Sequence, residues 1–461
     1  MGTTDRSAAD VPAVPRLARF RAPFVWGVWA LLSAGLVGYV WLVNDDFPIA
    51  DDWHLVPSYT GHQPLTLSWL WEQYNEHRMP LPKVLLVLGG AATGYDYRAG
   101  LLLSALALSG LAGLMIFAAG RLRGGPSFAD VLFPLVLLHW GQYETLLIAY
   151  ALNLVASTVL AGVALLVMVH AGGRLSLRHG VLFGLCLLLL PLCGSSGAVL
   201  VPALALWLAA AAAACWRSGG RRGRAEAVVL LTLALTSVVL TAVYFVSLEP
   251  VAGSPPRPTA FQAARTAVEV LAESAGPFAQ VSWPLSGLAV VALALATVLK
   301  LTRDWRTLPA ERLRPEGLFC FGAAMLSLAA GIGWGRGGGG PAAGFATRYA
   351  TLAAPILCLA YLAWRSAPDR RIAWGLCGVV ALLFLFNTGQ GITRAQVRRQ
   401  RMRDLQADVA SGLTPAEMAK KWGADIYAAN AEADLTERFE MLRRAGQGPY
   451  KGTRAARGRE D

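Results

Sequence analysis

The stretch Phe24-Val-Trp-Gly-Val-Trp-Ala-Leu-Leu-Ser-Ala-Gly-Leu-Val-Gly-Tyr-Val-Trp-Leu-Val43 contains no charged residue and is long enough to cross a bilayer as one helix. The polar segment before it ends in Arg16-Leu-Ala-Arg-Phe-Arg21 and shows no signal-peptide cleavage pattern. We therefore predict an uncleaved first membrane span, preceded by a cytoplasmic N-terminal tail over residues 1–23.

Apolar runs of this kind recur along the rest of the chain. Hydrophobic residues make up 55% of the 461 residues and charged residues 15%, whereas soluble domains carry about 25% charged residues. A chain this apolar must place much of its surface in lipid. We predict an all-α fold, a polytopic transmembrane helical bundle of about 11 spans over residues 24–388. The predicted spans are 24–43, 98–120, 128–140, 150–170, 180–193, 198–216, 225–248, 284–302, 317–335, 350–364 and 372–388.

Basic residues give the chain a net charge of +12 and gather in short clusters between the apolar runs, for example at 121–123, 174–178 and 217–224. This is the positive-inside pattern of cytoplasmic loops and does not indicate a nucleic-acid groove. We therefore expect membrane lipids as partners and no nucleic acid. The pattern predicts a multi-pass protein of the bacterial inner (cell) membrane, with a cytoplasmic N-terminus and a C-terminus on the outer, periplasmic side.

The segment 80–94 decides the number of crossings. It offers too few apolar residues for a span, and a crossing there would move several basic clusters to the outer side. We therefore predict an interfacial or re-entrant helix. The first outer loop then covers residues 44–97 and carries interfacial helices.

Residues 389–461 are predicted to form a short helical C-terminal tail on the outer face. Thr414-Pro-Ala-Glu417 is a capping box with proline at the first helical position. Leu435, Phe439 and Leu442 then repeat at helical spacing. The tail is therefore expected to bury one apolar face.

Two pairs of adjacent aspartates follow the first span, within Asn44-Asp-Asp-Phe-Pro-Ile-Ala-Asp-Asp-Trp53. A carboxylate at the membrane surface can act as general base toward a hydroxyl, and a pair can bind a divalent cation. Pro48 favours an extended exit for the first pair, whereas Asp51 and Asp52 stand where an interfacial helix could start. Because a helix start holds a base more rigidly, we predict that Asp51 or Asp52 is the catalytic base. The alternative is a solvated loop that ends the span.

Three further groups of polar residues lie in predicted outer segments: Trp71-Glu-Gln-Tyr-Asn-Glu-His-Arg78, His139-Trp-Gly-Gln-Tyr-Glu144 and the Gly-rich stretch 334–349. Topology gives no reason for arginines on the outer side, so we expect them to bind an anion, and the planar guanidinium suits phosphate. The alternatives are aromatic anchors, a helix cap and a snorkelling arginine. The predicted substrate-binding residues are Glu76, His77, Arg78, Glu144, Arg336, Arg348 and Tyr349.

With these residues in place, the chain resembles a bacterial branch of the GT-C superfamily of membrane glycosyltransferases, which use polyprenyl-phosphate sugars. The shared features are an acidic pair and membrane-hugging helices in the first outer loop, a second acidic position after the third span, and arginines in a late outer loop. These features correspond to Asp51-Asp52, residues 60–94, Glu144, and Arg336 with Arg348. The resemblance covers nearly the whole chain, but the first acidic pair is doubled and no long C-terminal globular domain follows.

The resemblance implies a GT-C-like bundle and an inverting glycosyltransferase. A sugar would pass from a polyprenyl-phosphate donor to a lipid-linked or cell-envelope glycan acceptor on the outer face. Asp51, Asp52 and Glu144 are the candidate ligands of a divalent metal ion, Mg²⁺ or Mn²⁺. A transporter or flippase of lipid-linked or anionic substrates is an alternative that predicts mid-membrane ionisable residues and an internal repeat. A polysaccharide polymerase or ligase and a non-catalytic scaffold are further alternatives.

Overall fold

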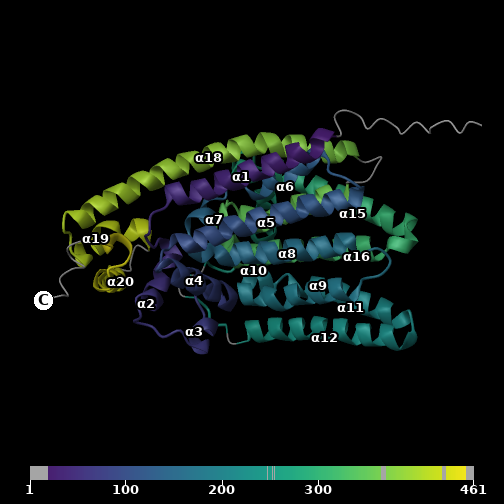
Figure 1. Ribbon diagram of the computed structural model, residues 1–461, viewed down its shortest axis with the longest axis horizontal. Coiled ribbons are helices and arrows are strands. Elements are labelled where there is room, and N and C mark those ends of the chain that lie inside the picture. Colours follow the sequence, from purple (N-terminus) through teal and green to yellow (C-terminus); the bar gives the residue numbers. More distant parts are fainter. Residues whose placement is uncertain are drawn as a thin grey trace, which may run out of the picture.

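Figure 1 shows the protein in a computed structural model, which describes residues 19–246, 248–251, 253, 255–364, 370–427 and 432–452. These residues fold into helices, and among them the only β-type pairing is an isolated bridge between Tyr74 and His77. The predicted N-terminal tail lies outside the described residues up to position 18. The α-helices are α1 (Arg21–Val43), α2 (Val56–Tyr59), α3 (Leu67–Trp71), α4 (Pro80–Thr93), α5 (Arg98–Arg123), α6 (Leu132–Leu137), α7 (Tyr143–Leu147), α8 (Leu152–His170), α9 (Leu177–Leu189), α10 (Ser195–Ala198), α11 (Val201–Arg217), α12 (Gly220–Phe245), α13 (Ala260–Ala272), α14 (Phe278–Val281), α15 (Leu285–Thr307), α16 (Leu313–Arg336), α17 (Arg348–Ala363), α18 (Arg370–Ala410), α19 (Pro415–Ile426) and α20 (Glu432–Ala445). The 3₁₀ helices are η2 (Ala50–Leu55), η3 (Phe128–Val131), η4 (Ala149–Ala151), η5 (Leu190–Cys193), η6 (Glu273–Ala275), η7 (Pro309–Glu311), η8 (Gly337–Gly339) and η9 (Gly448–Tyr450).

Eight helices among the described residues are long and apolar enough to cross a membrane. They lie side by side along the longest axis of the molecule (Figure 1). In the most apolar part of α1, only 22% of the residues are buried inside the protein. In the helix that contains α8, the corresponding share is 72%. The helices at the periphery of the bundle therefore expose large apolar side chains, such as Leu31 and Leu382, which are favourable in lipid and unfavourable in water. This surface indicates a membrane protein. The eight helices are Arg21–Val43, Arg98–Arg123, Ala149–His170, Ser195–Arg217, Gly220–Phe245, Leu285–Thr307, Leu313–Gly339 and Arg371–Ala410.

Three of the eleven predicted spans are shorter helices, at Phe128–Leu137, Leu177–Cys193 and Arg348–Ala363. Each is shorter than the roughly 20 residues that a span needs. The second of them stops where Pro191 and Gly194, at φ 121°, interrupt the apolar run. The helix α17 is 16 residues long and is buried along nearly its whole length, so other helices cover it in place of lipid.

The ambiguous segment forms α4, a helix of 14 residues that ends where Gly94 adopts a left-handed conformation. It packs against α3 and α5 at the same end of the bundle as η2 and α2 (Figure 1). Its buried Lys83 donates hydrogen bonds to the carbonyl oxygens of Trp69, at 2.7 Å, and Glu72, at 3.2 Å. At 14 residues, α4 is shorter than the roughly 20 residues that a span needs.

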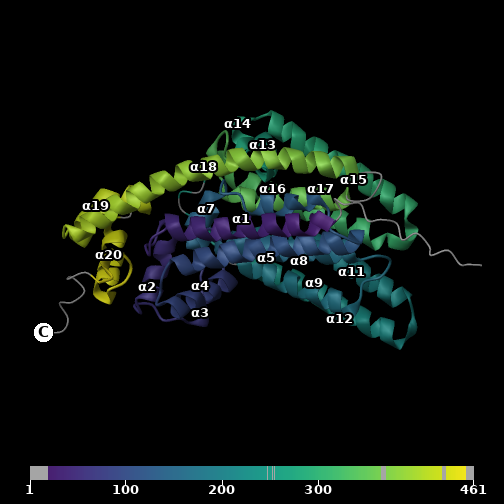
Figure 2. The ribbon, with the colours of Figure 1, turned by 45° about the horizontal axis from the view of Figure 1, so that its top comes forward.

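The C-terminal part begins with one continuous helix, α18, of 41 residues, so no break separates the predicted last span from the predicted tail at 388. The capping box of α19 is confirmed, because the Thr414 and Glu417 side chains each accept from the other's backbone N–H. In α20, the predicted apolar stripe is buried. Figure 2 shows α19 and α20 beyond the end of the bundle, next to α2. The tail and the first outer loop therefore lie at the same end of the molecule.

Candidate functional site

The loop that follows α1 places its two later aspartates in different surroundings. Ile49 is extended and Ala50 has φ 51°, and η2 then starts with both acids in its first turn. The Asp52 side chain is buried and accepts a hydrogen bond from the backbone N–H of Tyr150 at 2.7 Å. Asp51 stays half-buried and accepts from the Tyr74 hydroxyl at 2.6 Å. The predicted pair is thus divided between the protein interior and an open site.

Burial raises the pKa of Asp52 to about 7, although the backbone N–H groups of Tyr150 and Ala149 offset part of this rise. The carboxyl group joins η2 to η4, the 3₁₀ turn before α8. The Asp52 side chain is thus hydrogen-bonded to backbone, and it does not line the cavity that Asp51 lines.

Asp51 lines a cavity of about 920 Å³ at the end of the bundle that carries η2 and α4. Six other residues predicted for the site also line this cavity: Glu76, His77, Glu144, Arg336, Arg348 and Tyr349. They come from three segments of the chain that are far apart in sequence. The structure therefore brings together most of the residues that the sequence singled out.

The rest of the cavity is largely apolar. Its wall includes Val199, Phe245, Leu328, Ile332 and Leu352, from helices α10 to α12, α16 and α17 and the turns beside them. A cavity of this size is within the range of about 300–1,000 Å³ found for small-molecule sites. The combination of polar groups on the loops and apolar groups on the helices suits an amphipathic ligand.

Each of the two predicted arginines is paired with one of the predicted acids. Arg348 lies 3.0 Å from Glu144, and Arg336 lies 3.0 Å from Glu76. Both guanidinium groups keep more than a third of their side-chain surface exposed. Arg348 is also the first residue of α17, where the helix dipole disfavours a cation, and Glu144 offsets that effect. The pairs position the arginines while leaving them open to a ligand.

His77 is held by Ser195, a residue outside the predicted site. The Ser195 Oγ lies 2.7 Å from His77 Nδ1, and both residues line the cavity. Burial lowers the pKa of His77, so the ring is neutral at pH 7 and offers one N–H donor. The signal for Ser195 was the Gly194-Ser-Ser-Gly197 sequence, which creates the positive φ at Gly194 before the serine.

Arg78 lies away from the cavity. It lines a separate pocket of about 430 Å³ and sits over the Trp71 ring, 5.8 Å from its centroid. Its backbone N–H donates to the Tyr244 hydroxyl at 3.1 Å. The turn that pairs Tyr74 with His77 bends the chain between the two sites, so residues adjacent in sequence face different pockets.

The candidate metal ligands are divided, because Asp51 and Glu144 line the cavity and Asp52 does not. Across the described ranges, no three His, Cys, Asp or Glu side chains form a group that could hold a metal ion. Asp52 is turned toward Tyr150, and Glu144 is paired with Arg348. Asp51 and Glu144 remain as two cavity carboxylates from different segments.

The C-terminal tail contacts the loop that carries the aspartates, which the sequence did not predict. The Trp53 indole donates to the carbonyl oxygen of Ile426 at 3.1 Å, and Arg438 donates to the carbonyl oxygen of Trp53. Phe439 packs edge-on against Trp53 at 4.9 Å between ring centroids. The only sequence signal was the apolar stripe of α20, which requires a partner surface without specifying it.

A further buried acid lies beside the site. Glu273, at the start of η6, is 1% exposed, and its carboxyl oxygens have no hydrogen-bond partner within the described residues. Burial, with a smaller contribution from the nearby Glu144, raises the pKa of Glu273 to about 8. Glu273 is therefore protonated at pH 7 and adds no charge next to Glu144.

Comparison of the chain with protein families, with curated proteins and with solved structures gives no match. The functional argument consequently rests on the geometry and chemistry of the cavity.

Proposed function

We propose that this protein is a GT-C-type membrane glycosyltransferase that moves a sugar from a polyprenyl-phosphate donor to a lipid-linked or cell-envelope acceptor. The observation that carries the proposal is the convergence of Asp51, His77, Glu144, Arg336 and Arg348 on one cavity whose remaining wall is apolar. A base, two phosphate-binding cations and a hydrophobic surface are the groups that such a donor requires. We propose further that eleven helices cross the membrane, the three short ones included, in a GT-C-like arrangement.

In the proposed reaction, Asp51 acts as general base. The acceptor hydroxyl gives its proton to the Asp51 carboxylate and attacks the anomeric carbon, while the bond from that carbon to the phosphate oxygen breaks. The electron pair leaves with the polyprenyl phosphate. One displacement inverts the anomeric configuration. The Tyr74 hydroxyl holds the base in place through its 2.6 Å hydrogen bond.

The exposed edges of Arg336 and Arg348 bind the donor phosphate and stabilise the charge that it gains on leaving. A neutral His77 adds one hydrogen-bond donor without adding charge. The apolar wall around Ile332 and Leu352 accommodates the first isoprene units.

The outer face is the proposed side of the reaction. The cavity lies at the end of the bundle that carries the first outer loop, and the basic helix connections lie at the other end (Figure 1). By the positive-inside rule, the basic end belongs in the cytoplasm.

A photoreactive polyprenyl-phosphate probe tests whether the cavity is the donor site. Irradiation of the purified protein with the probe should label Ile332, Leu352 or their neighbours. Excess unlabelled polyprenyl phosphate should suppress that labelling. Labelling confined to the separate pocket around Trp71, or to the outer surface of α12 and α18, would show that the donor binds elsewhere.

The contact between Ser195 and His77 favours a second candidate, acyl transfer. In that reaction, His77 would take the Ser195 proton while the serine oxygen attacks the carbonyl carbon of an acyl ester. The bond from that carbon to the alcohol oxygen would then break, and His77 would return the proton to the departing alcohol. The two candidates differ in what they require. A serine nucleophile is essential to acyl transfer, whereas sugar transfer needs Ser195 only to orient the histidine. Acylation of Ser195 by an activated ester, detected by mass spectrometry, would favour the second candidate.

A further inference from the structure

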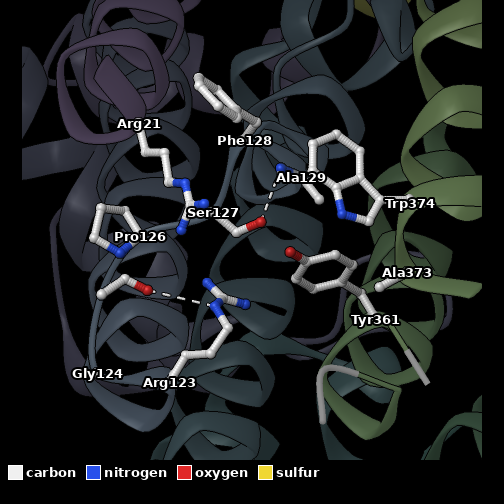
Figure 3. A pocket seen from close by; sticks show the side chains of 11 residues that line it. Arg21, Arg123, Gly124, Pro126, Ser127, Phe128, Ala129, Tyr361, Ala373 and Trp374 are labelled. Atoms are coloured by element: carbon white, nitrogen blue, oxygen red, sulfur yellow. Dashed lines mark hydrogen bonds between the residues drawn. The ribbon is translucent and has the colours of Figure 1, made fainter. Parts of the chain in front are cut away.

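A small pocket of about 200 Å³ lies at the end of the bundle opposite the cavity. It is enclosed by the start of α1, the turn 124–127 between α5 and η3, the end of α17 and the start of α18 (Figure 3). The cavity follows the other end of α1, so the two sites are separated by the length of that helix. The function of this pocket is independent of the proposed sugar transfer.

Asp130, the acid next to the pocket, already accepts hydrogen bonds from several groups of the protein. Asp130 is fully buried, and its carboxylate oxygens lie 2.7 and 2.5 Å from the Arg123 Nη2 atom. The Tyr361 hydroxyl and the Ser127 backbone N–H also donate to it, each at 2.8 Å. Asp130 therefore compensates the charge of Arg123 and presents no acceptor to the pocket.

Arg21 supplies a second cation, and among the described residues no carboxylate pairs with it. Figure 3 shows the Arg21 and Arg123 guanidinium groups approaching the hollow from two sides, with the indole nitrogen of Trp374 directed toward it from a third. The Ser127 Oγ accepts from the Ala129 N–H, so its own proton can be donated. The pocket thus carries net positive charge and several hydrogen-bond donors, a combination that selects an anion.

The size and surroundings of the pocket indicate the kind of anion. Its volume is below the range of about 300–1,000 Å³ that small-molecule ligands occupy, so it suits a single phosphate-sized group. Trp374, which lines the pocket, is about half exposed, and the half-exposed Phe24 packs edge-on against the lining residue Phe128 at 5.4 Å between ring centroids. Aromatic side chains with this exposure are typical of the headgroup level of a bilayer.

We propose that this pocket binds the phosphate group of an anionic phospholipid, whose acyl chains lie outside along the apolar surface of α1 and α18. Basic pockets between membrane helices are a known way of holding lipid headgroups, and the shared chemistry of the site is a phosphate oxyanion met by arginine and indole N–H donors. A free phosphate ion offers the same oxygens without the chains.

The test uses the full chain, purified in detergent and titrated with phosphatidylglycerol, phosphatidylcholine or inorganic phosphate, with bound ligand counted by native mass spectrometry. Arg21→Gln should weaken phosphatidylglycerol binding by about fivefold, because one charge is lost. Trp374→Phe, which loses the indole N–H donor, should also weaken it. Arg221→Gln is the matched control, because Arg221 is an exposed cation at the start of α12 that does not line the pocket.

Selective binding of phosphatidylglycerol that depends on Arg21 and Trp374 supports the proposal. Binding of inorganic phosphate alone, lost in Arg21→Gln, supports the anion site and overturns the assignment to a lipid. Equal losses in Arg21→Gln and Arg221→Gln would mean that the lipid responds to overall charge, and unchanged binding in both pocket variants would mean that no site is built here. Either result overturns the proposal.

Discussion

Arg348 is the most informative residue for testing the donor site, because the ion pair that it forms among the described residues contributes little to folding. The pair with Glu144 is 3.0 Å long, and 44% of the Arg348 side chain is exposed. Exposed pairs of this kind stabilise a protein by about 0–1 kcal/mol. Arg348→Ala should therefore insert and purify as the wild type does.

The same substitution should have a large effect on the donor. A hydrogen bond to a charged group contributes about 1.5–3 kcal/mol, which corresponds to roughly a 10- to 100-fold change in the dissociation constant. We expect a loss of that size for Arg348→Ala. Arg348→Lys should lie in between, because it keeps the charge and loses the planar fork.

The assay is the binding of fluorescent polyprenyl phosphate to purified protein in micelles, read by anisotropy. Arg401→Ala is the matched control, because Arg401 forms a similarly exposed ion pair with Asp425 at 3.1 Å and lies in the C-terminal half of α18, outside the cavity. An Arg348→Ala protein that binds as tightly as the wild type, or an Arg401→Ala protein that is equally impaired, would refute the phosphate role of Arg348.

Three further outcomes are expected. Between pH 4 and 7, folded Asp52 keeps a proton that the unfolded chain has lost, so thermal stability should fall as pH rises, by up to about 1.4 kcal/mol per pH unit from this group. Asp52→Asn keeps an acceptor for the Tyr150 N–H and should flatten that slope; an unchanged slope would assign the titration to other groups. Ser195→Ala should slow sugar transfer moderately by freeing His77, and complete loss of sugar transfer would contradict a merely orienting role for Ser195. Reporter fusions after Arg371 and after Gln390 should report opposite sides of the membrane, and the same side for both would contradict the proposed topology.

The sequence was sufficient to predict the helical membrane bundle, because apolar length is a local property. The same holds for the α19 capping box and the buried stripe of α20, which depend on residues a few positions apart. The count of long helices could not be predicted as reliably. Burial of α17 inside the bundle, for example, lets a 16-residue helix stand where the hydropathy pattern predicts a full span.

For the site, the sequence predicted which residue types would gather at the outer end, and most of them line one cavity. It could not separate Asp51 from Asp52, because that depends on the register of η2 and on a hydrogen bond to Tyr150, 98 residues away. It also could not show that Arg78 turns away from His77. Contacts between distant segments decide each of these points.

Transfer of a labelled sugar by Asp51→Asn protein tests the central claim most directly. Wild type and variant are reconstituted in vesicles with a panel of radiolabelled polyprenyl-phosphate sugars and membrane acceptor lipids, and product is counted. Asn keeps the Tyr74 hydrogen bond but cannot take a proton, so we expect a loss of about 10²–10⁴-fold with unchanged donor binding, while Asp46→Asn, outside the cavity, stays active. Wild-type product should show an inverted anomeric centre. Full transfer by Asp51→Asn, or a retained configuration, would contradict the account.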